Sequence, residues 1–71
     1  MSKWILVHDI ETQATLSINI NHIEEITKRD SGSLIVTESG DRIKAKESVS
    51  EVAQKVADAW ENRFYGLLDN L

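Results

Sequence analysis

The chain has 71 residues, a formal net charge of −4 and no cysteine, and 41% of its residues are apolar and 28% charged. This composition is typical of a small soluble globular domain and excludes a disordered chain, a disulfide scaffold and the usual structural zinc sites. No apolar run approaches the roughly 18 residues of a membrane span, and the start of the chain lacks a signal-peptide pattern. We therefore expect a single domain over residues 1–71, cytoplasmic and without a membrane partner.

The first part of the chain predicts a β-hairpin. The segment "KWILVH" predicts a strand over about residues 3–8. Both of its faces are apolar, because Trp4 and Ile5 point to opposite sides. The segment "ATLSINI" alternates apolar and polar residues and predicts a half-buried strand over about residues 14–20. The polar "DIETQ" between them predicts the turn.

The segment "NHIEEITKRD" is compatible with two structures. Ile20, Ile23 and Ile26 are three residues apart, which fits one helical turn as well as a strand entered through a tight bend. We favour the bend and assign no further strand to this segment.

The next part of the chain predicts a second hairpin. The segments "SLIVTES" and "RIKAK" predict strands over about residues 33–39 and 42–46, and "SGD" supplies a glycine for the reversal between them. In the second of these strands, Ile43 and Ala45 are expected to face the core.

A helix is predicted over about residues 49–65. Ser48 and Glu51 have the spacing of a capping box, and apolar residues recur at helical spacing from Val49 to Leu67. The predicted fold class is therefore α+β. We expect a four-stranded, mostly antiparallel sheet made of two hairpins, with one C-terminal amphipathic helix packed on one face.

No motif in the chain predicts catalysis. His8 and His22 lack metal-binding spacing, and the glycines stand singly, so no phosphate-binding loop is present. Glu24 and Glu25 are adjacent and would point to opposite faces of a strand, which excludes a carboxylate pair. We expect a protein that is not an enzyme, with no catalytic residue, no metal and no cofactor.

The apolar residues exceed what one helix can cover. The first strand is apolar on both faces, and the tail "LLDNL" extends beyond the predicted helix. A small domain without disulfides also gains stability by self-association. These features predict a small protein-interaction module that occupies a surface on a partner protein and forms a homodimer, with the two interfaces not separable from the sequence. The expected interface residues are Trp4, Ile5, Val7, Tyr65, Leu68 and Leu71.

An alternative is a nucleic-acid-binding regulator that uses the second hairpin. Basic residues on one face of a sheet can follow a phosphate backbone. The acidic total charge and the absence of interleaved aromatic residues favour a solvated, aggregation-resistant strand instead. The residues that would contact nucleic acid are Arg29, Arg42, Lys44 and Lys46.

The run "SININHIEEI" followed by "SLIVTESGDRIKAKESVSEVAQKV" resembles the small FlbD-like proteins encoded among bacterial flagellar genes. The resemblance covers roughly residues 16–56, and its most specific element is "KESV" followed by Glu51 and Val52. The segment "SKWILVHD" and the tail that contains Trp60 depart from the family pattern. The resemblance implies a fold and a non-enzymatic character, and the family is bacterial. Small phage-encoded inhibitor proteins have a similar economy of size, which keeps a phage origin open. LytTR-type DNA-binding domains show a similar order of hairpin and helix, which keeps the nucleic-acid alternative open.

Overall fold

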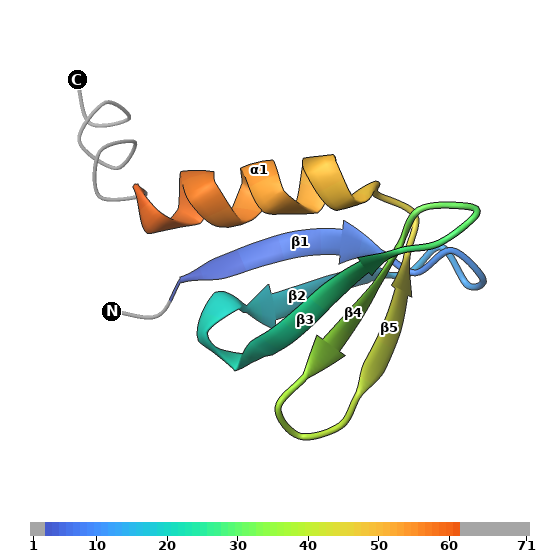
Figure 1. Ribbon diagram of the computed structural model, residues 1–71, viewed down its shortest axis with the longest axis horizontal. Coiled ribbons are helices and arrows are strands. Elements are labelled where there is room, and N and C mark those ends of the chain that lie inside the picture. Colours follow the sequence, from blue (N-terminus) through green and yellow to red (C-terminus); the bar gives the residue numbers. More distant parts are fainter. Residues whose placement is uncertain (1–2, 62–71) are drawn as a thin grey trace.

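The computed structural model describes residues 3–61, and Figure 1 shows its elements. The predicted α+β class with one helix at the C-terminal end is confirmed. The elements are β1 (Trp4–His8), β2 (Thr15–Asn19), the 3₁₀ turn η1 (Ile20–His22), β3 (Ile23–Lys28), β4 (Ser33–Thr37), β5 (Arg42–Ala45) and α1 (Val49–Trp60).

The expected single sheet of four strands is replaced by two antiparallel sheets. One contains β1 and β2, and the other contains β3, β4 and β5 in that order. Both expected hairpins are present, at somewhat shorter lengths than predicted. The helix ends at Trp60 with Glu61 as its C-cap, and its expected continuation to about residue 65 lies outside the described residues.

β3 is an additional strand, and a β-bulge within it explains the irregular spacing of its apolar residues. Ile23 pairs with Thr37 and Glu25 pairs with Val36, so Glu24 has no partner in the ladder. The extra residue turns the strand, and Ile23 and Ile26 both pack against the core although they are three positions apart. The tight bend favoured from the sequence is η1, which leads directly into this strand.

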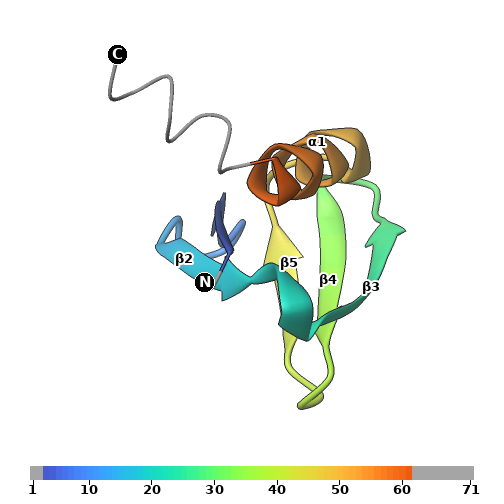
Figure 2. The same ribbon diagram turned by 90° about the vertical axis from the view of Figure 1, so that its left-hand side faces the viewer.

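The two sheets meet at one corner, where the end of β1 reaches the end of β5. The N–H of Lys46 donates to the carbonyl of His8 at 2.7 Å, and the N–H of Ile10 donates to the carbonyl of Lys44 at 2.9 Å. Figures 1 and 2 show the sheets diverging from this corner, with α1 lying across one opening between them. The helix packs on β1 and β3.

The core fills the space between the two sheets and the helix. Ile35 lies at its centre, with Ile26 opposite on β3 and Ile43 opposite on β5. The helix contributes Val52 and Ala59 to the same core because they lie on its inward face. The buried apolar residues are Ile5, Val7, Ile18, Ile20, Ile35, Ala45, Val52 and Ala59.

A buried glutamate holds the corner where the sheets meet. One carboxylate oxygen of Glu47 accepts from the backbone N–H of His8 at 2.9 Å, and the other lies 2.6 Å from Nδ1 of the same residue. Its own carbonyl accepts from the buried Ser33 hydroxyl at 2.9 Å. Glu47 therefore joins β1, β4 and the start of the helix.

Among the described residues, no helix is both long enough and apolar enough to cross a bilayer.

Candidate functional site

Large apolar side chains remain exposed on a fold whose core is already filled. Trp4 is 53% exposed, Leu6 is 54% exposed and Trp60 is 53% exposed. Trp4 and Leu6 lie together on the outer face of β1, because alternate residues of a strand point to the same side. Trp60 belongs to α1, which packs on the other side of β1 against Ile5 and Val7. We use the name tryptophan surface for these three exposed residues, Trp4, Leu6 and Trp60.

Lys3 brings the end of the helix close to the beginning of β1. Its ammonium group donates to the carbonyl of Trp60 at 2.8 Å and lies 5.0 Å from the centroid of that indole ring. A cation at this position complements the C-terminal end of the helix dipole and the face of the ring. Trp4 follows Lys3 directly, so both tryptophans lie at the same end of the molecule.

The predicted interface residues divide into three groups. Trp4 is exposed, as the prediction requires. Ile5 and Val7 are buried in the core, with exposed fractions of 4% and 0%, because they face the second sheet and the helix. They offer no surface to a partner, and this corrects the prediction for these two residues. Tyr65, Leu68 and Leu71 lie outside the described residues.

Two residues of the tryptophan surface, Leu6 and Trp60, are not among the predicted interface residues. Leu6 has the same position in the alternation as Trp4, so the alternation already placed it on the face opposite Ile5. Trp60 is one of the apolar residues at helical spacing, a pattern that favours burial against the sheets. It is the last residue of α1 and is exposed, although its neighbour Ala59 is buried.

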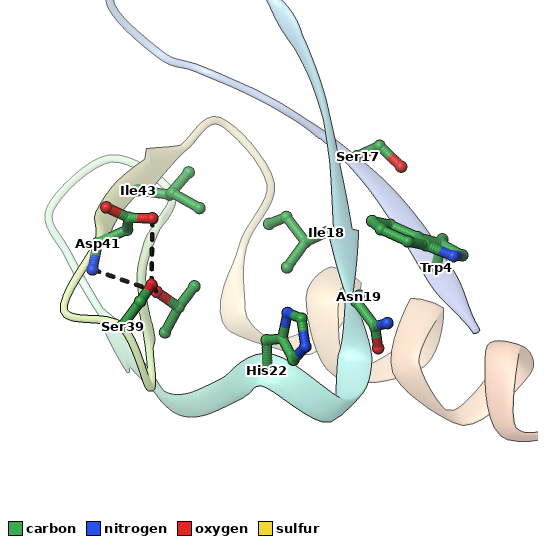
Figure 3. Close-up of a pocket in the computed structure, with 9 residues that line it drawn as sticks. Trp4, Ser17, Ile18, Asn19, His22, Ser39, Asp41 and Ile43 are labelled. Atoms are coloured by element: carbon green, nitrogen blue, oxygen red, sulfur yellow. Dashed lines mark hydrogen bonds between the residues drawn. The ribbon is translucent and has the colours of Figure 1, made fainter. Parts of the chain in front are cut away.

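A shallow cleft of about 180 Å³ lies between β2 and the turn that joins β4 to β5 (Figure 3). Ile18 and Ile43 form its apolar part. On the turn, the polar groups bond to one another: the hydroxyl of Ser39 lies 2.9 Å from that of Thr37 and 3.3 Å from the Asp41 carboxylate. The remaining lining residues are Trp4, Ser17, Asn19 and His22.

This cleft lacks the arrangement of a catalytic site. His22 has its Nε2 4.0 Å from an oxygen of Glu38, and both side chains are more than half exposed. Neither group contacts a serine or threonine hydroxyl in the hydrogen bonds of the described residues. The cleft therefore offers a concave surface beside β2.

The predicted basic residues are spread over two ends of the second sheet. Arg42 lies opposite Val36 near the β4–β5 turn, whereas Arg29 lies in the turn between β3 and β4 at the other end of β4. Lys44 lies on the same exposed face as Arg42. Lys46 follows the strand, and its backbone bonds to His8 at the corner.

Acidic residues interrupt this basic surface. The ammonium group of Lys44 lies 3.9 Å from a carboxylate oxygen of Glu11. On the far side of β4, Glu25 lies opposite Val36, on the same outer face as Arg42. A phosphate backbone crossing this face would meet carboxylates as well as cations.

The pair formed by His8 and Glu47 is structural. Burial raises the pKa of the Glu47 carboxyl, but the hydrogen bonds from the His8 ring and from the His8 backbone outweigh it and leave that pKa lowered. The carboxylate is therefore ionised and bonded at neutral pH. Within residues 3–61, no three His, Cys, Asp or Glu side chains are grouped to hold a metal ion.

Comparison of the chain with protein-family models, with curated proteins and with solved structures finds no match.

Proposed function

We propose that the chain is a small, self-associating protein-interaction module without enzymatic activity, which acts by occupying a surface on a partner protein. The observation that carries the proposal is the tryptophan surface, in which Trp4, Leu6 and Trp60 are each more than half exposed. We also propose a cytoplasmic location, and an origin that is bacterial, as in the FlbD-like proteins, or phage, as in small phage-encoded inhibitors.

Large apolar side chains that remain in water carry an unfavourable hydration free energy. Full burial of a side chain of this size contributes about 1.5–3 kcal/mol, and aromatic anchors dominate the energetics of many interfaces. The core of the described residues is complete without these side chains. A partner that covers them would gain this free energy without any rearrangement of the fold.

The test is capture of partner proteins by three forms of the tagged chain. The wild type, Leu6→Asp and Lys44→Glu are each incubated with nuclease-treated bacterial lysate, and thermal unfolding verifies that all three are folded. Leu6 and Lys44 are both exposed residues near the middle of a strand, so the two variants are matched. We expect a stoichiometric protein that is retained by the wild type and by Lys44→Glu but lost with Leu6→Asp.

The nucleic-acid alternative gives the opposite result. If Arg29, Arg42, Lys44 and Lys46 bind phosphates, nucleic acid is retained from untreated lysate, Lys44→Glu weakens this retention, and added salt weakens it steeply. This outcome, with Leu6→Asp behaving like the wild type, would overturn the protein-interaction proposal.

A further inference from the structure

In the described residues, the outer edges of β2 and β3 have no neighbouring strand, and these two edges differ in chemistry. The edges of β1 and β5 meet at the corner near His8 and Lys46. The edge of β3 is interrupted by the bulge at Glu24 and carries charged, exposed side chains, features that oppose pairing with another strand. The edge of β2 has neither protection, since its sequence "TLSIN" contains no charge, proline or bulge.

The hydrogen bonds of the first hairpin show which residues of β2 face outward. The N–H of Ile20 donates to the carbonyl of Lys3 at 3.0 Å, and the N–H of Asp9 donates to the carbonyl of Ala14 at 2.9 Å. Bonded pairs alternate along an antiparallel ladder, so the even-numbered residues of β2 are the ones bonded to β1. Thr15, Ser17 and Asn19 therefore direct their backbone N–H groups away from β1.

An independent bond supports this alternation. His8 lies opposite Thr15, and the backbone N–H and carbonyl of His8 bond to Glu47 and Lys46 on the side away from β2. In the described part of the chain, no strand pairs with the outward side of β2. Its backbone donors and acceptors are available for a strand from outside.

We propose that the chain forms a symmetric homodimer in which β2 pairs antiparallel with β2 of a second copy, centred on Ser17. In this register Ser17 lies opposite the same residue of the second copy, and Thr15 lies opposite Asn19. All of these residues direct their backbone groups outward, so each can bond to its counterpart. The proposal rests on the self-association in the proposed function and assigns it to one strand.

The side chains of β2 favour a second copy of the same strand as the partner for its open edge. On the outer face the pairing places uncharged hydroxyl and amide groups together, and on the inner face it places Leu16 opposite Ile18. No charge meets a like charge, which is the usual obstacle to pairing of identical strands. Figure 3 shows Ile18 and the β4–β5 turn on one side of β2 and Ser17 and Asn19 on the other, so this turn faces the inner side of the strand.

The dimer would join the two hairpins into one four-stranded sheet with the order β1, β2, β2, β1. Leu6 lies opposite Ser17, and Trp4 lies opposite Asn19, on the outer face of each hairpin. The outer face of the joined sheet would therefore carry Trp4 and Leu6 from both copies. A partner would meet two equivalent binding surfaces on one rigid sheet.

The first test replaces single residues with proline at two strand edges. Ser17→Pro removes one outward N–H and leaves the bonds to β1 in place, because residue 17 does not donate to β1. Lys28→Pro is the matched control: the N–H of Arg29 donates to the carbonyl of Gly32, so Lys28 directs its own N–H away from β4. Analytical ultracentrifugation should show dissociation constants close to wild type for Lys28→Pro and raised at least about tenfold for Ser17→Pro.

The second test uses charge and does not depend on how the proline variant folds. Ser17→Glu and Ser17→Lys each place two like charges opposite one another in the proposed register, so each variant alone should be monomeric. An equimolar mixture should form a heterodimer, because opposite charges then lie across the symmetry axis.

The outcomes separate this inference from the proposed function. If the wild type and the variants Ser17→Pro, Ser17→Glu and Ser17→Lys are all dimeric, the pairing of β2 is overturned and self-association still stands. A wild type that is monomeric at every concentration would overturn both the pairing and the self-association. Loss of partner capture by Leu6→Asp is measured separately and would still support the interaction module.

Discussion

The carboxylate of Glu47 accepts two hydrogen bonds from a single residue, His8, which lies 39 positions away in the chain. One comes from the backbone N–H and the other from the ring. This contact closes the corner between the two sheets, at a residue with only 8% of its surface exposed. Among the partly buried hydrogen bonds of the described side chains, it joins the residues that are furthest apart in the sequence.

This contact predicts a loss of stability in acid. The pKa of Glu47 is lowered in the folded chain, so the folded state binds fewer protons than the unfolded state near that pKa. Its stabilising contribution is complete above the ordinary pKa of 4.5 and disappears as the pH falls through the lowered pKa. Urea unfolding at pH 7 and at pH 3 should show this loss in the wild type.

Replacement of the carboxylate isolates its contribution. Glu47→Gln should lower the free energy of unfolding at pH 7 by about 1–3 kcal/mol, because a buried, charge-assisted pair of bonds is weakened. The variant should also lose less stability than the wild type between pH 7 and pH 3. Glu61→Gln, at an exposed position, is the control, and an equal effect of both changes would contradict the role given to Glu47.

The two glycines with positive φ predict different costs. Gly32 has φ of +77° and Gly40 has φ of +94°, so alanine is strained at both positions. A Cβ at Gly32 would also collide with the carbonyl oxygen of Ala45, whereas a Cβ at Gly40 meets no atom within 4 Å. We expect Gly40→Ala to cost about 1 kcal/mol and Gly32→Ala about 3 kcal/mol. Chemical denaturation measures both, and equal costs would argue against the close approach at Gly32.

Truncation of two neighbouring residues of β1 should change the free energy of unfolding by very different amounts. Val7 is fully buried and Leu6 is more than half exposed. Val7→Ala should lower the free energy of unfolding by about 1–3 kcal/mol, because it leaves a cavity in the core. Leu6→Ala should change it by less than about 0.5 kcal/mol. A large loss with Leu6→Ala in a monomeric sample would show that this side chain contributes to the core.

The start of the helix should depend on one hydroxyl. The Ser48 side chain accepts from the N–H of Glu51 at 3.2 Å, and the Glu51 carboxylate accepts from the N–H of Ser48 at 3.0 Å. Ser48→Ala should therefore cost about 1 kcal/mol. Ser50→Ala removes a hydroxyl two residues later that contacts only the Ser48 hydroxyl in the bonds described, and should cost less than about 0.5 kcal/mol. Thermal unfolding of both variants distinguishes a cap from a general effect of serine removal.

Local sequence was sufficient for the elements whose signals are local. The capping box at Ser48 and Glu51 marked the start of the helix, because both groups lie within one turn of each other. The glycine at position 40 and the alternation around Ile43 marked the second hairpin for the same reason. In β3, however, the bulge at Glu24 disturbed the alternation, and a spacing of three resembled a helical turn.

Which face of β1 is exposed depends on contacts between segments that are far apart in the sequence. Trp4 and Ile5 are both apolar. The alternation of a strand predicts that they lie on opposite faces of β1, but it does not predict which face is buried. That side was decided when the second sheet and the helix packed against Ile5 and Val7, which left Trp4 and Leu6 outside. The exposed face is therefore a property of the packing of distant segments.

The sequence by itself determined the α+β class, both hairpins and the start of the helix, since hydrophobic alternation, turn glycines and a capping box act over a few residues. Only the tertiary structure decided that the strands form two sheets, that Glu47 joins them through His8, and that β2 retains an open edge. These features depend on hydrogen bonds and burial between residues far apart in the chain, and such contacts exist only after the chain has closed on itself.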